Sequence, residues 1–467
     1  MKGEPDFLQN LRDEMGDGRQ WLDRGIVIAY AVLTGLAVVV FTLLADAAFG
    51  LYQSLRGALW WAPLLWTPAL TALVVWSIRR WAPGAAGSGV PQVLTALAPE
   101  TPIASRSRFV SLRLSLAKIA AVAGGLLAGL SIGRQGPSVQ IAAGVMLHAR
   151  RWLSPKTDIS TRELLVAGGA AGIAAAFNTP LGGIVFAIEE LSRRLQDRSS
   201  GLMLAAIVVA GLVAVSAFGN LSYFGRIRAD GVSWWNLLGP GLLVALGCGL
   251  LGGLLSRLML ASFTGLPDRF CAYRRKRPVR FAALCGFVVA VIAIVSDGNA
   301  VGVGHHHTHA LLDAADNGGE HQPLVFTGLK FIASWLSAWA GVPGGIFGPS
   351  LSLGAGLGAD VAWLLDSPHG PALIALGMCG FLAAVTQTPI TAMIIVMEMT
   401  DGHSMVLSLM ACALLASLLS RMISRPLYST MSLLMMRSLR GDANVAPRGS
   451  GPAPLVGSPA PTPPADR

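Results

Sequence analysis

Charge is scarce in this 467-residue sequence, because only 13% of its residues are charged while 53% are hydrophobic. Soluble globular domains carry about 25% charged residues. The deficit argues against a row of ordinary soluble domains and predicts a polytopic membrane protein. Several apolar runs, including 25–44, 201–218 and 237–255, approach the roughly 20 residues that a membrane-spanning helix needs.

Cysteine is scarce as well, and its pattern excludes two kinds of site. The five cysteines are odd in number, form no CxxC pair and lie mostly inside apolar runs. They predict neither a disulfide framework nor a zinc site, and we interpret them as packing residues. They are Cys248, Cys271, Cys285, Cys379 and Cys412.

Motifs of enzymes and metal sites are also missing. No HExxH or GxSxG occurs, and acidic residues are rare within the apolar runs, so we predict no enzymatic activity. Histidines cluster in His305-His306-His307-Thr308-His309, but their Gly-rich surroundings favour a solvated loop over a metal site. The Met-rich residues 431–436 favour packing over copper binding. We predict no metal and no cofactor besides a transported ion.

The net charge of +10 comes from basic groups that lie between the apolar runs. Examples are Arg79-Arg80, Arg150-Arg151 and Arg274-Arg275-Lys276-Arg277. The positive-inside rule places such groups on cytoplasmic loops, which we prefer to nucleic-acid binding. The first 24 residues are polar and mixed in charge, so they do not resemble a cleaved signal peptide.

One short stretch interrupts membrane-like sequence where a helix should begin. It reads Gly133-Arg134-Gln135-Gly136-Pro137-Ser138, with apolar residues on both sides. Pro137 suits the first turn of a helix. Because a helix N-terminus carries roughly +0.5 of an elementary charge, this break is a candidate anion site. The alternative is a simple Gly-Pro turn between two core helices.

The second half of the chain repeats landmarks of the first half in the same order. Lys118 precedes Pro137 by as many residues as Lys330 precedes Pro349. Farther along, Thr179-Pro180 and Thr388-Pro389 stand at equal distances before Glu189 and Glu398 respectively. Duplication with interruptions at corresponding positions predicts a binding site between the two halves.

Four motifs on this duplicated frame resemble those of the CLC family of chloride channels and chloride/proton antiporters, over about residues 21–436. They are Gly87-Ser88-Gly89-Val90-Pro91, Gly133-Arg134-Gln135-Gly136-Pro137, Gly345-Ile346-Phe347-Gly348-Pro349 and Arg425-Pro426-Leu427-Tyr428. The resemblance, to a bacterial type without a C-terminal regulatory domain, implies an all-α polytopic membrane protein of about 18 partly re-entrant helices in two inverted repeats. We expect a cytoplasmic tail at 1–20, the repeats at 21–219 and 220–436, and a disordered cytoplasmic tail at 437–467.

The same resemblance implies a homodimer in the cell inner membrane, with chloride and the lipid bilayer as partners and both termini in the cytoplasm. It also implies the residues that bind chloride. Ser88, Tyr428 and the backbone amides of Ile346 and Phe347 would form a central site, and the helix N-termini at Arg134, Gly136 and Gly348 would complete the pathway. The symmetric Lys118 and Lys330 favour a role in raising the local positive potential over snorkelling to the interface.

Gln135 departs from the family pattern, which usually has a gating glutamate at this position. An ionised carboxylate competes with chloride, whereas a glutamine cannot titrate and is expected to imitate the open, neutral state. We therefore predict passive, channel-like chloride transport. The alternatives are chloride/proton antiport by another proton route, or transport of another small anion such as nitrate or fluoride, although Ser88 favours chloride in the family pattern.

Glu190 resembles the inner proton-transfer glutamate of the antiporters, so it is a possible inner proton site. It is open to three interpretations: a relic, a structural acid paired with Arg193 or Arg194, or part of a relay whose outer partner lies elsewhere. With Gln135 at the gating position, we favour the structural acid.

Overall fold

The computed structural model describes residues 18–192, 200–219, 224, 227, 234–265, 269–317 and 325–439. Within these ranges the regular elements are helices, nineteen of them α-helices, and the extended backbone pairs in one isolated two-residue bridge. The prediction of an all-α polytopic fold is confirmed. The predictions made for residues 1–17 and 440–467, and for Arg193 and Arg194, lie outside the described residues.

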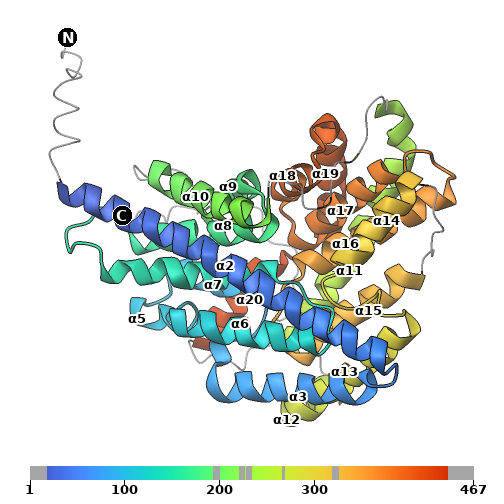
Figure 1. The fold of residues 1–467 in the computed structure, drawn as a ribbon, viewed down its shortest axis with the longest axis horizontal. Coiled ribbons are helices and arrows are strands. Elements are labelled where there is room, and N and C mark those ends of the chain that lie inside the picture. Colours follow the sequence, from blue (N-terminus) through green and yellow to red (C-terminus); the bar gives the residue numbers. More distant parts are fainter. Residues whose placement is uncertain are drawn as a thin grey trace, which may run out of the picture.

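Long apolar helices form the outer part of the bundle. Among the described residues, five helices are long and apolar enough to cross a membrane. The longest, α2, runs diagonally across the whole molecule (Figure 1). These helices are α2 (Gly18–Ala58), α10 (Ser200–Phe218), α11 (Trp234–Thr264), α13 (Pro278–Val295) and α19 (Val406–Ile423).

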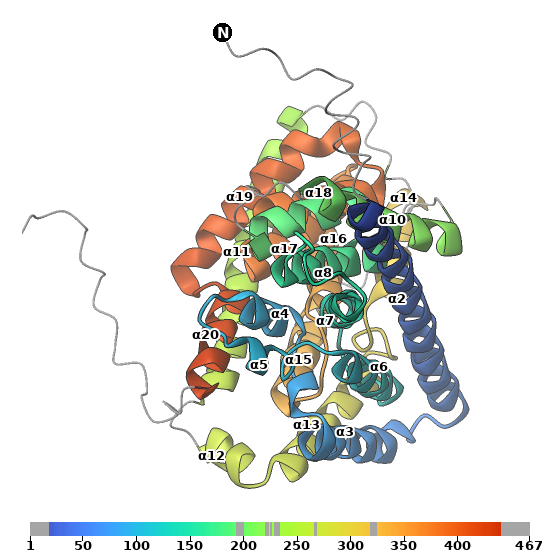
Figure 2. The same cartoon turned by 90° about the vertical axis from the view of Figure 1, so that its left-hand side faces the viewer.

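Shorter helices fill the interior. Nearly every residue of α7, α8, α16 and α17 is buried, so these helices are apolar all round. In Figure 2, α7 and α8 lie between α2 on one side and α11 and α20 on the other. The interior helices are α7 (Gln135–His148), α8 (Thr161–Phe177), α9 (Pro180–Phe186), α16 (Phe347–Leu364), α17 (Gly370–Thr386) and α18 (Pro389–Thr400).

The remaining helices connect these layers. Several are too short to span a bilayer, as re-entrant segments are. They are α3 (Pro63–Trp81), α4 (Val90–Leu97), α5 (Ile103–Arg106), α6 (Leu112–Leu127), α12 (Arg269–Lys276), α14 (His305–Asn317), α15 (Val325–Ala340) and α20 (Leu427–Leu439). A π-helical turn, Ala187–Ser192, extends α9.

The two halves place equivalent helices in the same order. The series α6, α7, α8, α9 in the first half corresponds to α15, α16, α17, α18 in the second. Helix α2 begins at Gly18 and α20 ends at Leu439, so both helices pass the boundaries predicted for the repeats by about three residues. The division between the repeats at 219 and 220 stays a prediction.

Two glutamates tie the halves together reciprocally. The Glu189 carboxylate accepts a hydrogen bond from the Thr391 N–H at 2.6 Å, in the first turn of α18. The Glu398 carboxylate accepts one from the Gly182 N–H at 3.0 Å, in the first turn of α9. Each helix thus supplies the acid that caps the other, and both acids favourably face a helix N-terminus.

The histidine cluster is not a solvated loop, so that prediction is wrong. Helix α14 begins at His305, and the rings of His305 and His309 meet at a centroid distance of 4.5 Å. The two residues are one helical turn apart, which brings their side chains together. Phe224 packs against both rings. Within the described residues, no group of three or more histidine, cysteine or acidic side chains is arranged to hold a metal ion.

The packing interpretation of the cysteines is confirmed. All five thiols are buried and unbridged. Three of them, Cys248, Cys379 and Cys412, lie in the large core around α11, α17 and α19. They fill space there as small apolar side chains do.

Candidate functional site

The two predicted helix breaks contact each other through their backbones. Gly133 and Gly345 form an antiparallel bridge in which each N–H donates to the other's carbonyl at 2.7 Å. Helix α7 begins two residues after Gly133, and α16 begins two residues after Gly345. The first N–H groups of both helices lack intrahelical acceptors, so two positive helix ends lie next to each other at the junction of the repeats.

Glycine is required at this junction because the backbones approach closely. A Cβ atom on Gly345 would lie 2.8 Å from the backbone nitrogen of Gly136. One on Gly136 would lie 2.5 Å from the Ser88 hydroxyl oxygen. Real Cβ contacts are longer than this, so a larger residue would push the helix ends apart. The same closeness places the Ser88 side chain against the start of α7.

The loop that carries Ser88 is held by side chains from three directions. The Lys118 ammonium donates to the carbonyls of Ala85 and Gly87, both at 2.7 Å. The Gly89 N–H donates to the Gln92 side chain at 2.9 Å. The third direction is that of Gln140, whose amide donates to the Gly84 carbonyl at 3.0 Å. These bonds fix Ser88 before any ion arrives, as a preorganised site requires.

Ser88, Phe347 and Tyr428 come together as predicted from the motifs. The rings of Phe347 and Tyr428 stack with centroids 5.9 Å apart, and the Ser88 hydroxyl neighbours that of Tyr428. Helix α20, which carries Tyr428, is joined to α4 by a hydrogen bond of 3.0 Å between the Thr95 and Ser432 hydroxyls. Residues from three distant segments of the chain therefore meet at one point.

The hydroxyls of Ser88 and Tyr428 are buried next to each other, and among the described residues neither has a hydrogen-bond partner besides the other. Buried polar groups are nearly always paired, because a buried donor or acceptor without a hydrogen-bond partner costs about 1–3 kcal/mol. Two such donors beside two helix N-termini are suited to hold an anion through partial charges alone, without a charged side chain at the site. Their chemistry agrees with the predicted chloride-binding roles, which stay predictions.

Gln135 lies inside the junction and does not point away from it. Its side chain is 1% exposed, and its Oε1 lies 3.0 Å from where a Cβ on Gly348 would be. The expectation that Gln135 imitates the open, neutral state of the gate stays a prediction. The partial negative charge of an amide oxygen is attracted to the helix N-termini, and this atom has no hydrogen-bond partner within the described part of the chain.

The side chain of Arg134 turns from the junction toward α2. Its guanidinium forms an ion pair with Asp46, while the Arg134 carbonyl accepts hydrogen bonds from Ser138. Sequence reasoning missed Asp46. An acid in the last part of a long apolar helix was the available signal, because charged residues in membrane segments are costly and mark functional or paired positions.

Lys118 and Lys330 have equivalent environments in the two repeats. Both are fully buried, so neither snorkels. Lys330 donates to the carbonyls of Val301 and Gly302 at 3.3 and 2.8 Å, as Lys118 does to its own loop. Each ammonium is thus bonded to a Gly-rich loop. Their predicted effect on the potential of the pathway stays a prediction.

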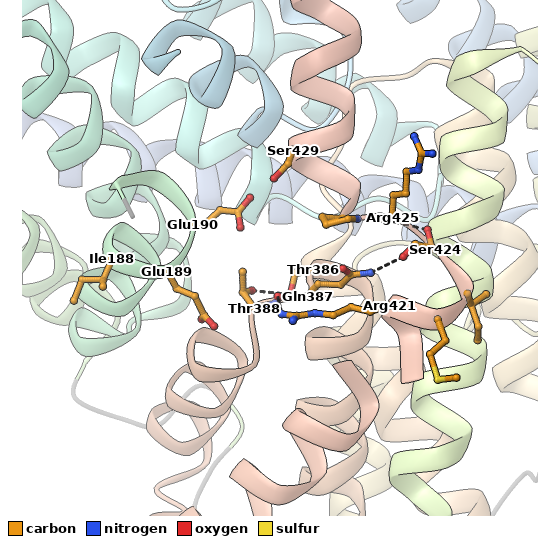
Figure 3. A pocket seen from close by; sticks show the side chains of 13 residues that line it. Ile188, Glu189, Glu190, Thr386, Gln387, Thr388, Arg421, Ser424, Arg425 and Ser429 are labelled. Atoms are coloured by element: carbon orange, nitrogen blue, oxygen red, sulfur yellow. Dashed lines mark hydrogen bonds between the residues drawn. The ribbon is translucent and has the colours of Figure 1, made fainter. Parts of the chain in front are cut away.

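Glu190 borders a cavity of about 730 Å³ that Ser429, the residue after Tyr428, also lines. Figure 3 shows the Glu190 carboxylate pointing toward Ser429 at one end of this cavity, with Arg421 and Arg425 on the other wall. The predicted pairing of Glu190 with Arg193 or Arg194 lies outside the described residues. The cavity gives Glu190 contact with open space. Its role as an inner proton site stays a prediction.

Fold and site together define a multi-pass membrane protein with a buried polar junction between two repeats. A sequence profile described as "Voltage gated chloride channel" matches residues 70–421. The chain belongs to this family, and the recognition of the CLC family from the motifs is confirmed.

Relatives and solved structures agree with this membership. The chain is 30% identical to the H(+)/Cl(-) exchange transporter ClcA of Vibrio vulnificus over 82% of this chain and 81% of that one. ClcA of Cronobacter sakazakii is also 30% identical, over 86% and 87%. The fold is similar to that of a slow cyanobacterial Cl-/H+ antiporter, with a TM-score of 0.76, 21% identity and coverage of 90% and 99%. It is also similar to a CLC-type fluoride/proton antiporter, with a TM-score of 0.70, 18% identity and coverage of 90% and 98%.

Proposed function

We propose that this protein transports chloride across the membrane through the junction of its two repeats. The observation that carries the proposal is the pair of buried, adjacent hydroxyls, Ser88 and Tyr428, which have no partner besides each other among the described residues and lie beside the N-termini of α7 and α16. Ile346 and Phe347, Gly348, and Arg134 with Gly136 would supply the backbone groups of the pathway. The names of the relatives favour chloride as the transported anion.

Exchange of chloride for protons is the mechanism that the relatives favour, since those named above are exchange transporters. Passive conduction, the prediction made from the sequence, is the second candidate, and Gln135 is the observation that favours it. Because Gln135 cannot bind and release a proton, an exchanger with this residue needs a proton route that passes through other groups. Glu190, which borders the cavity near Tyr428, is the candidate for the inner part of that route.

Simultaneous flux measurements separate the two mechanisms. Purified protein is reconstituted into liposomes with a chloride gradient, and external chloride and pH are recorded together. Exchange predicts that the chloride gradient drives protons uphill at a fixed ratio, and that Glu190→Gln abolishes the proton flux. Passive transport predicts chloride flux with no uphill proton movement. Liposomes that show no chloride flux above protein-free controls would overturn the proposal itself.

Other aspects of the assignment rest on the family alone and belong to the same proposal. We propose a homodimer in the cell inner membrane, with both termini in the cytoplasm. Transport needs no cofactor besides the ion and no enzymatic step, because the free-energy gradient of the anion drives it.

A further inference from the structure

Each repeat carries a loop of the same form immediately before a short helix. Gly87-Ser88-Gly89 precedes α4, and Gly302-Val303-Gly304 precedes α14. All four glycines have positive φ, with values of 81° and 117° in the first loop and 66° and 92° in the second. Only glycine adopts this backbone readily. Val303 is therefore the structural counterpart of Ser88.

The hydrogen bonds of the loops support the same correspondence. The first loop is bonded through its carbonyls to the ammonium of Lys118, and the second through its carbonyls to that of Lys330. Both lysines are fully buried. The equivalence thus extends from backbone conformation to the side chains that hold each loop in place.

The two counterparts also make equivalent contacts with the helix N-termini. A Cβ on Gly136, the second residue of α7, would lie 2.5 Å from the Ser88 hydroxyl oxygen. A Cβ on Gly348, the second residue of α16, would lie 2.6 Å from Cγ1 of Val303. Ser88 therefore lies against one helix end of the junction, and Val303 against the other.

Gln135 converges on the same helix end as Val303. Its Oε1 lies 3.0 Å from the Cβ position on Gly348 that Val303 also approaches. Its counterpart in the other repeat is Phe347, which stacks on Tyr428 near Ser88. The junction thus has two ends: a Tyr428 end with two hydroxyl donors, and a Gln135 end with an apolar side chain in the place of a hydroxyl.

We propose that Val303 lines the anion pathway at its Gln135 end, and that its side chain and Gln135 together form a constriction there. This inference rests on the proposed chloride transport. A valine cannot donate a hydrogen bond, so an anion gains less at this end than between Ser88 and Tyr428. Apolar constrictions limit ion passage in this way. Val303 would set the rate at which anions cross the Gln135 end, while Ser88 and Tyr428 set the binding affinity.

A cysteine at position 303 tests whether the side chain is reached from the pathway. All five native thiols are buried, so Val303→Cys adds the reactive site for a charged methanethiosulfonate reagent. We expect modification to reduce chloride flux at least tenfold, and chloride to slow the modification. The matched control is Val325→Cys, at an exposed position at the start of α15, where modification leaves flux unchanged.

Two further variants test the role of the side chain without any reagent. Val303→Ser introduces a hydroxyl like that of Ser88 at this position. This variant should change chloride flux several-fold and bind chloride more tightly. Val303→Phe should lower flux at least tenfold while the protein keeps the unfolding temperature of the wild type. Flux within twofold of wild type in both variants, or a thiol at 303 that stays unmodified while the thiol at 325 reacts, would overturn the inference.

These outcomes are separate from a failure of the proposed function. If the wild-type protein carries no chloride in liposomes, chloride transport itself is wrong. If the wild type carries chloride and the Val303 variants behave like it, the function stands and only the assignment of Val303 fails.

Discussion

At the scale of single residues, Gln135 places a group that cannot titrate at the junction. Its neutral amide lies between two helix N-termini, where a carboxylate would be attracted by the helix ends and would compete with an anion. A carboxylate about 5 Å from chloride would repel it by roughly 3 kcal/mol at an effective dielectric constant of about 20. The glutamine removes this repulsion at every pH.

Replacing this amide by an acid should introduce a pH-dependent gate. In Gln135→Glu we expect chloride flux to fall at neutral pH, where the new carboxylate is ionised. Flux should recover as the pH falls through the pKa of the acid, which is about 4.3 when unperturbed. Liposome flux measured between pH 4 and pH 8 checks this, with Gln135→Met as the control that cannot titrate. A pH-independent flux in the glutamate variant would contradict a gating role.

Ser88 and Tyr428 should each contribute measurably to chloride affinity. Removing one donor from a hydrogen bond costs about 1 kcal/mol, so Ser88→Ala and Tyr428→Phe should each weaken chloride binding about fivefold by isothermal titration calorimetry. Ser216→Ala, on an exposed face of α10, is the control. Unchanged affinity in both variants would mean that the hydroxyls do not hold the anion.

At the scale of elements, the junction of α9 and α18 depends on the two glutamates that cap the opposite helix. Loss of a capping group costs a helix about 0.5–2 kcal/mol. We expect Glu189→Ala and Glu398→Ala to lower the unfolding temperature by similar amounts, because their contacts are equivalent. Scanning fluorimetry of the detergent-solubilised protein measures this, with the exposed Glu100→Ala as control. Two variants as stable as the control would exclude a capping role.

The helix breaks could be predicted from local sequence, whereas the contacts around them could not. Gly-Pro pairs within apolar sequence mark the starts of α7 and α16, because backbone preferences are local. The pairing of Glu189 with α18 joins residues about 200 positions apart, so no local pattern contains it. The Gly-rich surroundings of the histidines predict a loop after Gly304, whereas the structure has a helix there in which the rings of His305 and His309 contact each other.

At the scale of the whole molecule, the bundle presents a large apolar surface. Leu407 and Met422 on α19 are 84% and 80% exposed, and Leu181 on α9 is 52% exposed. In water such a surface would be unstable, but in a bilayer it contacts lipid or another subunit. The composition of the sequence predicted this surface. The equivalence of Val303 and Ser88 was not predicted, because it is visible in the backbone conformation of the two loops and in no sequence motif.

The number of subunits per particle can be counted directly, which tests the dimer that the family implies. Fluorescently labelled protein, reconstituted at a high ratio of lipid to protein, should bleach in two steps per particle, because the association is expected to persist in the membrane. A population that bleaches in single steps, at a known labelling efficiency, would show that the subunits work alone.

The bridge between Gly133 and Gly345 limits how the two halves of the chain can change over evolutionary time. A side chain on Gly345 would come too close to the backbone of Gly136, and one on Gly133 would crowd Pro349 and the Gly345 carbonyl, so a larger residue at either position requires the other half to move as well. Around this fixed crossing the counterparts have already diverged, serine against valine and glutamine against phenylalanine. A duplicated protein can in this way keep one backbone contact between its repeats unchanged. The two ends of the junction can then differ, with one end holding an ion and the other letting it pass.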